Sequence, residues 1–325
     1  MNTEAMMRAS VLIPTRNGMP LLESCLRAVL AQDTPWPFEV IAIDSGSGDG
    51  TWPLLQSLPI TALRIAPREF NHGATRNLAA AKAQGEYLVF LVQDAVPADT
   101  AWLRRLVEGA ALPGAAASYG RQLVWPTHDR LVHLHVREAL PQPRQRAQQR
   151  LPDGPSWDSL APRERLELSR FSNVSSCISR RIWEQHPFNP EPYGEDIEWA
   201  QRIIRLGYTI VYEPAAAVYH SHDRSSWYEF KRAYADHELV ARLFGYRLFP
   251  QLRNLAAAWA KGSARGIMAI WNGSESLPWR TIQSLRAPVV IGARHLGSCL
   301  GARAGLARRH GTLWRCVDQT LRRGV

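Results

Sequence analysis

Two neighbouring acids, Glu195 and Asp196, directly follow Gly194 and begin a predicted helix. A carboxylate held in this way can act as a general base, taking the proton from a hydroxyl group as its oxygen attacks. Two acids at the start of a helix are also common as simple caps that stabilise the helix dipole. The pair therefore indicates catalysis only if other functional groups lie beside it.

The stretch 71–77 (NHGATRN) carries an arginine where it could hold a diphosphate. An alanine-rich helix is predicted over 74–83, so Arg76 is expected in its first turn, where backbone N–H groups and a guanidinium together suit phosphate oxygens. The alternative is that Thr75 caps the helix and Arg76 is solvated. We favour the first reading, because a cation in the first turn opposes the helix dipole unless an anion compensates it.

A third group of residues suits a metal ion. Asp94 follows Gln93 at the end of a wholly apolar run, 87–92, and a lone carboxylate there matches a hard divalent cation that bridges to phosphate oxygens. Asp94 could instead cap the following helix. His220 and His222 follow a predicted strand, and strand alternation lets only one of them face the same site as Asp94. Either histidine could also be purely structural.

Asp44 opens a glycine-rich loop, 44–51 (DSGSGDGT), after the second predicted strand. A dinucleotide-binding fingerprint would place its glycines after the first strand, where this chain has Pro14, Thr15 and Arg16 instead. Asp44 either accepts a hydrogen bond from a base N–H or a ribose hydroxyl, or forms an Asx turn that caps the next helix. The motif alone does not separate these two readings.

The elements that must position these residues alternate between strands and helices. Short apolar runs at 10–14, 38–43, 60–65 and 87–92 are separated by segments of helical spacing, which predicts an α/β fold with an open, mostly parallel sheet flanked by helices. Ligands of such sheets bind at the carboxyl ends of the strands. Because the polar residues follow strand ends, we expect them to meet at one edge of the sheet.

The second half of the chain has a weaker pattern. A mobile loop is predicted over 139–155, which is rich in Pro, Gln and Arg, and strands are predicted over 171–178 and 208–212. The helix that begins at Gly194 is expected to end at Gly207. Beyond Trp227 the pattern is helical, with tryptophans among many arginines.

Composition excludes several classes of protein. The net charge of +10 lies entirely in the C-terminal part, because the chain from Gln251 onward has twelve Lys or Arg and two acids. A uniformly basic nucleic-acid-binding protein is therefore disfavoured, and no recognised nucleic-acid module is present. The four cysteines form no CxxC pair, so we expect no zinc site. The chain shows no signal-peptide pattern and no run long and apolar enough to span a membrane, which favours a cytoplasmic protein.

Five motifs in order resemble the family 2 glycosyltransferases of the GT-A fold. They are VLIPTRN (11–17), IDSGSGDGT (43–51), FNHGATRN (70–77), FLVQDA (90–95) and GEDIEW (194–199). Within that family the chain is most similar to bacterial rhamnosyltransferases, over about residues 10–249. The resemblance implies a GT-A domain over 1–249, with a Rossmann-like nucleotide-binding part at about 8–120 and an acceptor and catalytic part at about 121–249. Residues 250–325 would form a helical, basic extension.

The resemblance also implies a role for each matching residue. The nucleoside pocket would be lined by Pro14, Thr15 and Arg16, with Asp44 on the pyrimidine base, and the diphosphate and metal end of the donor would meet Arg76, Gln93 and Asp94. Asp196 would be the catalytic base, with Glu195 beside it, and His220 or His222 would join Asp94 as a metal ligand. Val92 stands where the family's DxD motif has its first acid, so the site has fewer carboxylates than the motif provides.

The activity implied is a one-step, inverting transfer of a sugar to a hydroxyl of a glycan or lipid-linked acceptor in cell-surface polysaccharide synthesis. The donor would be dTDP-rhamnose or a UDP-sugar, with Mg²⁺ or Mn²⁺. The basic extension could be a solvated helical appendage, or it could hold the enzyme against anionic phospholipid or a lipid-diphosphate acceptor, on the cytosolic face of the inner membrane. We favour the second reading. Two alternatives remain open: a family member that uses a UDP-hexose, and a non-catalytic protein that binds nucleotides or glycans, which Val92 would favour. A nucleotidyltransferase is disfavoured, since no basic glycine-rich loop follows the first strand.

Overall fold

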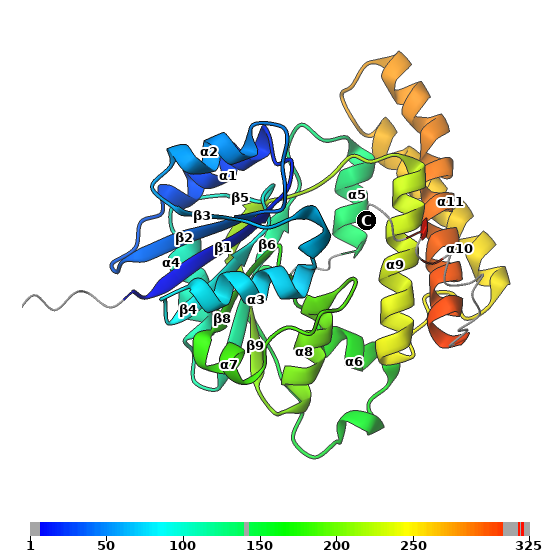
Figure 1. Cartoon of the computed structure of the whole chain (residues 1–325). Coiled ribbons are helices and arrows are strands. Elements are labelled where there is room, and N and C mark those ends of the chain that lie inside the picture. The colour runs from blue at the N-terminus through cyan, green and yellow to red at the C-terminus, as the bar shows by residue number, and fades with distance from the viewer. Residues whose placement is uncertain (1–6, 140–142, 308–317, 319, 322–325) are drawn as a thin grey trace, which may run out of the picture. The chain divides into compact units, whose positions relative to one another are not determined.

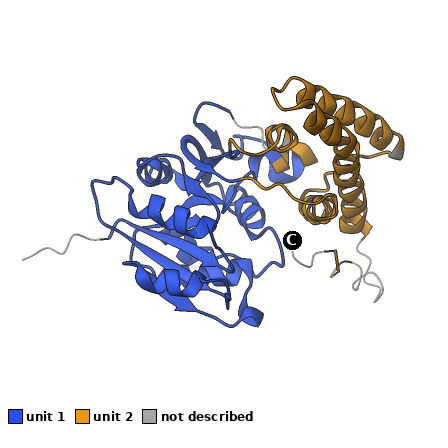
Figure 2. Cartoon of the chain, turned by 90° about the horizontal axis from the view of Figure 1, so that it is seen from above, with its two compact units in different colours: residues 1–125, 142–160, 167–220 blue, residues 126–141, 161–166, 221–325 orange. Residues whose placement is uncertain are grey.

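The computed structural model describes residues 7–139, 143–307, 318, 320 and 321. The chain divides into two compact units, which Figure 2 colours separately. Unit 1 comprises residues 1–125, 142–160 and 167–220, and unit 2 comprises residues 126–141, 161–166 and 221–325. This division places the segment 221–249 with the C-terminal helices, whereas the sequence pattern placed it with the first domain.

Unit 1 is built on one sheet. Across the described residues its strands run in the order β3-β2-β1-β4-β8-β6-β9-β5, and β7 also pairs with β9. The strands are β1 (Ala9–Thr15), β2 (Phe38–Asp44), β3 (Thr61–Arg64), β4 (Tyr87–Leu91), β5 (Val96–Pro97), β6 (Ala115–Leu123), β7 (Ala147–Gln149), β8 (Ser175–Ser179) and β9 (Thr209–Tyr219). Pairing is parallel from β3 to β4 and between β6 and β9, and antiparallel around β8, β5 and β7. The predicted α/β class is confirmed, with parallel pairing concentrated in the first half of the sheet.

Helices accompany the strands in unit 1 (Figure 1). They are α1 (Leu21–Leu30), α2 (Thr51–Ser57), α3 (His72–Lys82), α4 (Trp102–Ala110), α7 (Arg180–Gln185) and α8 (Glu195–Arg205), with short 3-10 turns at Pro67–Glu69 and Trp157–Ser159. The helix α6 (Pro162–Leu168) crosses the boundary between the units. Unit 2 contains α5 (Arg130–Ala139), α9 (Ser226–Phe244), α10 (Leu252–Trp271) and α11 (Leu277–Ala307). No helix in the described part of the chain is both long enough and apolar enough to cross a membrane.

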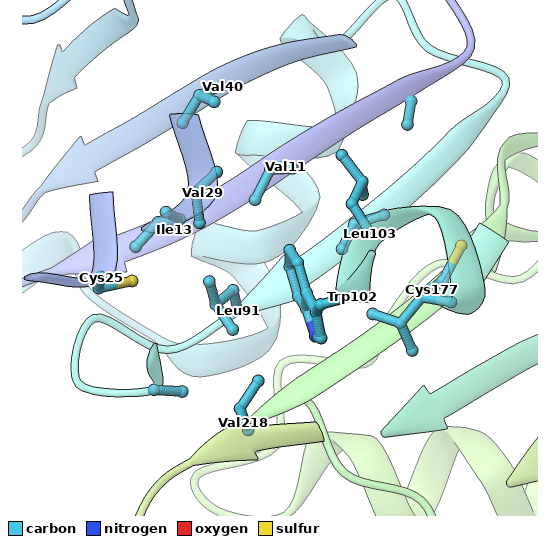
Figure 3. Packing of buried hydrophobic residues seen from close by; sticks show 14 of the residues in the cluster. Val11, Ile13, Cys25, Val29, Val40, Leu91, Trp102, Leu103, Cys177 and Val218 are labelled. Carbon is cyan, nitrogen blue, oxygen red and sulfur yellow. The ribbon is translucent and has the colours of Figure 1, made fainter. Parts of the chain in front are cut away.

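The core of unit 1 holds the parallel strands in place (Figure 3). Side chains of β1 and β4, such as Val11, Ile13 and Leu91, are completely buried against helices. Trp102 of α4 is also fully buried, and its indole N–H donates to the hydroxyl of Ser175 over 2.9 Å. Burying about 200 Å² of a Trp side chain stabilises the fold by roughly 5 kcal/mol. The strand ends that carry the polar residues therefore project from a rigid base.

Helix α3 begins earlier than the sequence pattern indicates. Its N-cap is Asn71, whose side-chain oxygen accepts a hydrogen bond from the backbone N–H of Ala74 over 3.0 Å. The alternative that Thr75 is the cap is therefore wrong, because Asn71 caps the helix and Thr75 lies within its first turn. Arg76 consequently lies in the second turn of α3 rather than the first.

The described part of the predicted loop over 139–155 contains a strand, β7, which pairs with β9. Arg146, at its start, forms an ion pair with Glu213 of β9, with 2.5 Å between its Nη2 and a carboxylate oxygen. Glu213 is only 4% exposed, so its charge needs such a partner. The sequence pattern missed this strand, because its residues are mostly polar and its partners, β9 and Glu213, lie far away in the chain.

In unit 2, glycines bring α9 and α11 into backbone contact. A Cβ at Gly297, Gly301 or Gly305 would lie within 2.4 Å of a backbone carbonyl oxygen of α9. At Gly301 that distance is 2.1 Å, to the oxygen of Tyr234. Glycine at every fourth position therefore forms a smooth stripe that no larger residue could replace without separating the two helices.

Candidate active site

The ends of β1 and β4 are joined by the side-chain amide of Gln93. Its oxygen accepts the backbone N–H of Arg16 over 2.8 Å, and its nitrogen donates to the carbonyl of Arg16 over 3.0 Å. Arg16 itself is exposed, whereas Thr15 is buried and donates its hydroxyl to the carbonyl of Ile43 over 3.3 Å. Pro14 lies partly buried within β1. The residues predicted to line a nucleoside pocket therefore share one strand end, which Gln93 fixes in position.

Asp44 is completely buried at the end of β2, next to Thr15 in the parallel register. Its carboxylate accepts the backbone N–H groups of Gly46 and Ser47 over 3.3 and 3.2 Å, as an Asx turn does. It also forms an ion pair with Nε of Arg64 over 3.1 Å. The structure thus contains the Asx turn, but Asp44 does not cap the next helix, because α2 begins at Thr51 with Gly50 as its N-cap. The structure also adds a cation from β3. A contact between Asp44 and a nucleotide base stays a prediction.

Arg76 and Glu195 form a buried ion pair, with 2.9 Å between Nη1 and a carboxylate oxygen and side chains that are each 6% exposed. Arg76 also donates to the backbone carbonyl of His72, and Asn173 donates its side-chain N–H to Glu195 over 3.1 Å. Burial by itself would raise the pKa of Glu195, but the Arg76 guanidinium, His72 and this hydrogen bond lower it below its ordinary value. Glu195 is therefore ionised and structurally engaged. A contact between Arg76 and a diphosphate stays a prediction.

Asp196 is the second acid of the pair and is less enclosed than Glu195. Its two oxygens accept the backbone N–H groups of Asn173, over 3.1 Å, and of Ile197, over 2.8 Å. Burial, followed by the neighbouring charge of Glu195, raises its pKa to about 6. A carboxylate can accept about four hydrogen bonds, so Asp196 retains capacity for a further donor. A pKa near neutrality also suits a general base.

Asp94 and His220 lie close together at the carboxyl end of the sheet, with 3.7 Å between Oδ1 of Asp94 and Nε2 of His220. The other ring nitrogen of His220 lies 3.0 Å from the side-chain oxygen of Gln122, in β6. That hydrogen bond favours a proton on Nδ1 and leaves Nε2 toward Asp94 as a ligand atom.

His222 follows His220 by two residues, in the segment that the division assigns to unit 2, and its role as a metal ligand stays a prediction. The strand alternation from which only one histidine was expected to face Asp94 does not extend to these residues, because β9 ends at Tyr219, and which histidine would bind a metal stays a prediction.

The separate groups are linked through the segment 172–174, just before β8. The backbone N–H of Val92 donates to the carbonyl of Val174 over 3.3 Å, which places the end of β4 beside this segment. Gln122, the partner of His220, donates to the hydroxyl of Ser172 over 3.3 Å. Asn173, between Ser172 and Val174 in the chain, donates hydrogen bonds to both Glu195 and Asp196. The predicted acids and the Asp94–His220 pair are thus connected to one short segment.

The donor set suits a divalent metal ion. A carboxylate and an imidazole, as Asp94 and His220 provide, are ligands that Mn²⁺ accepts, whereas Mg²⁺ prefers oxygen ligands alone. The hydrogen bond that His220 donates to Gln122 fixes the imidazole ring, as outer ligands of metal sites commonly do. The residues present therefore fit a metal site, although Val92 contributes no carboxylate to it.

Three residues of this site were not predicted from the sequence: Arg64, Gln122 and Asn173. Each acts through another side chain, namely Asp44, His220 and the two acids of α8. A supporting residue of this kind has no local motif of its own. The signal that could have found them is the need of each buried polar group for a partner.

The sequence of this chain is similar to those of sugar-transferring enzymes. The family model described as glycosyl transferase family 2 matches residues 10–167. The O-antigen chain rhamnosyltransferase RfbN of Salmonella typhimurium is 34% identical over 232 residues, which cover 70% of each chain. The O-antigen chain rhamnosyltransferase WbaN of Salmonella anatum is 30% identical and covers 69% of each chain.

Solved structures agree on the fold. The mannosyltransferase PcManGT of Pyrobaculum calidifontis, solved with GDP-Man and Mn²⁺, aligns with a TM-score of 0.51 at 18% identity, over 96% of this chain and 79% of that one. Residues 1–349 of TarS from S. aureus align with a TM-score of 0.52 at 15% identity, over 90% of this chain and 91% of that one. At such low identity these likenesses concern the fold alone, which is the predicted GT-A fold.

Proposed function

The chain belongs to glycosyltransferase family 2, and from this premise we propose that it transfers rhamnose from a nucleotide diphosphate donor to a hydroxyl of a glycan or lipid-linked acceptor, with inversion at the anomeric carbon. The relatives RfbN and WbaN, named as O-antigen chain rhamnosyltransferases, support this choice of sugar and of cell-surface polysaccharide as the product. The observation that carries the proposal is the position of Asp196, a partly exposed carboxylate with a raised pKa that the backbone N–H of Asn173 holds just before β8.

In the proposed reaction, Asp196 takes the proton of the acceptor hydroxyl as that oxygen attacks the anomeric carbon. The bond from this carbon to the diphosphate breaks on the opposite side, so the sugar inverts. Glu195 does not take part in the proton transfer, because Arg76 and Asn173 occupy its carboxylate. Its charge instead helps to raise the pKa of Asp196. General-base assistance of this kind contributes about 10²–10⁴-fold to the rate.

Donor binding would use the end of β1 and the loop after β2. Thr15 and Asp44 lie opposite each other in the parallel register, and Gln93 fixes the backbone of Arg16 beside them. Asp94 and His220 would hold the divalent cation, and a bound cation there would neutralise the charge of the departing diphosphate. Mn²⁺ suits these ligands better than Mg²⁺.

A donor panel tests the proposed sugar. The purified chain would be incubated with Mn²⁺ and either dTDP-rhamnose, UDP-glucose, UDP-N-acetylglucosamine or GDP-mannose, and release of the nucleoside diphosphate would be measured. We expect dTDP-rhamnose to be consumed fastest. Consumption of UDP-hexoses alone would reject rhamnose while keeping glycosyl transfer, and binding of donors without any turnover would favour the non-catalytic alternative.

A further inference from the structure

Helices α10 and α11 of unit 2 run antiparallel and are joined by the indole N–H groups of two tryptophans. Trp259 donates to the backbone carbonyl of Pro288 over 2.9 Å, and Trp271 donates to the hydroxyl of Ser284 over 3.0 Å. Small residues let the helices approach, since a Cβ at Gly292 would lie 3.2 Å from the Trp259 ring nitrogen. The two helices therefore present adjoining surfaces.

One side of α11 is a stripe of exposed aliphatic residues. Their exposed fractions are 63% for Ile282, 73% for Leu285, 61% for Val289, 46% for Leu296 and 39% for Leu300. The spacings of three, four and seven residues place them on one face of the helix. Other positions of α11 are buried within unit 2, including the glycines that contact α9. An apolar stripe on an otherwise packed helix indicates a surface that another body covers.

The two tryptophans extend this stripe onto α10. Trp259 lies against Gly292 and Pro288, beside Val289, and Trp271 bonds Ser284, beside Leu285. The indole N–H groups are satisfied, yet the rings are 44% and 46% exposed. Amphipathic aromatic rings of this kind are enriched where protein meets the headgroup region of a bilayer. We call the surface formed by Trp259, Trp271, Ile282, Leu285, Val289 and Leu296 the α10/α11 face.

The charge around the α10/α11 face is positive. Within residues 252–307, the span of these two helices, the sequence has seven Lys or Arg and one acid, Glu275, which Arg130 contacts across 3.2 Å. Three of the seven form ion pairs with acids elsewhere in unit 2, namely Arg265, Arg286 and Arg294. Arg253 and Lys261 of α10 are exposed to solvent. A second copy of the chain would bring the same positive charge to the face and would be repelled, whereas anionic headgroups would be attracted.

We propose that the α10/α11 face docks on the surface of an anionic phospholipid bilayer, with its apolar stripe and tryptophans at the headgroup boundary and its cations on the lipid phosphates. The helices would lie on the membrane, since neither is apolar enough to cross it. This proposal locates on two helices the membrane contact that the basic composition predicts, and it does not depend on the sugar that is transferred.

Vesicle binding by the full chain tests the proposal without any measurement of sugar transfer. Vesicles would consist of phosphatidylcholine, with and without about a third phosphatidylglycerol, and bound protein would be measured by co-sedimentation. We expect binding to the anionic vesicles to exceed binding to phosphatidylcholine by at least roughly tenfold at low salt, and to weaken as salt is raised. Equal binding to both vesicles, or none to either, would overturn the proposal.

Variants of exposed residues identify the face. The double substitution Leu285→Glu with Val289→Glu should weaken binding to the anionic vesicles by roughly tenfold or more, since two apolar contacts are lost and two negative charges are added. The pair Leu285→Ser and Val289→Ser should weaken it in the same direction without added charge. Leu206→Glu, at a residue of unit 1 that is 54% exposed, is the matched control and should bind as the native chain does.

Two outcomes would show that the α10/α11 face does not dock on a bilayer. If the α10/α11 face joined two copies of the chain, sedimentation equilibrium without lipid would show a dimer that the Leu285→Ser and Val289→Ser variant dissociates, and the bilayer proposal would be rejected. If the face variants bound vesicles as well as the Leu206→Glu control did, the lipid contact would lie elsewhere and the proposal would also fail. Circular dichroism of each variant confirms that these exposed substitutions leave the fold intact.

Discussion

Replacing Glu195 by Gln should move the pH dependence of catalysis toward lower pH. Burial and the charge of Glu195 are the two largest causes that raise the pKa of Asp196 to about 6. The substitution removes the charge of Glu195. It also leaves the Arg76 guanidinium, which lies 2.9 Å from the Glu195 carboxylate in the native chain, without its counter-charge. Both changes favour the ionised form of Asp196, so its pKa falls toward the ordinary value of 3.8.

The size of the effect follows from the titration of a single base. With a pKa of about 6, Asp196 is about 91% ionised at pH 7 and about 9% ionised at pH 5, so kcat/KM should fall roughly tenfold between these values. A base at its ordinary pKa of 3.8 would lose less than about a tenth of its activity over the same range. The acid limb of the profile is therefore a sensitive measure of the environment of Asp196.

The assay is the release of nucleoside diphosphate at saturating metal ion, from pH 4.5 to 8, for the native chain and for Glu195→Gln. Arg76→Met is the opposing control, because loss of the cation should raise the pKa of Asp196 and move the limb to higher pH. Thermal unfolding of both variants must be followed, since breaking a buried ion pair typically costs about 3–5 kcal/mol. A native profile that is flat down to pH 5, or a limb that Glu195→Gln shifts upward, would refute this account of Asp196.

Two further predictions concern the metal site and the helices of unit 2. Gln122→Leu removes the hydrogen bond to His220 and should raise the Mn²⁺ concentration needed for half-maximal activity by about 10–100-fold. The control Gln84→Leu, at an exposed glutamine, should leave this concentration unchanged. Equal metal requirements of the two variants would show that Gln122 does not support the metal site. Gly301→Ala places a methyl group 2.1 Å from the Tyr234 carbonyl oxygen and should lower the free energy of unfolding, measured by denaturant titration, by about 1–3 kcal/mol. The control Gly48→Ala, with no atom within 4 Å of the added carbon, should change it by less than about 0.5 kcal/mol. A similar effect of both substitutions would contradict the close approach of α9 and α11.

The first half of the fold could be predicted because each strand carries its own signal. The apolar runs of β1, β2 and β4 are buried on both faces, and this environment leaves the same pattern in any sequence. The strand β7 could not be predicted in this way. It pairs with β9, which lies far away in the chain, next to the ion pair of Arg146 with Glu213, and its own residues are mostly polar.

The candidate site shows the same division. Asp94, Arg76, Glu195 and Asp196 stand in recognisable motifs, and the structure connects them to one short segment. Asn173 has no motif, yet its backbone and side chain hold both acids of α8. Its importance comes from a contact between the start of β8 and the start of α8, which only the folded chain reveals. The buried pairing of Arg76 was likewise not predictable, because it requires Glu195 to lie within hydrogen-bonding distance of α3.

The proposed role of Asp196 is tested most directly by Asp196→Asn, measured for both donor turnover and nucleotide binding. Asparagine has the same shape, and its one oxygen can accept one of the two backbone N–H groups, of Asn173 or Ile197, that the two carboxylate oxygens accept, but it cannot take a proton. We predict that kcat falls by about 10²–10⁴-fold while the Kd for the nucleoside diphosphate stays within about twofold of the native value. Turnover that survives the substitution would show that another group accepts the proton, and the mechanism proposed for this site would be wrong.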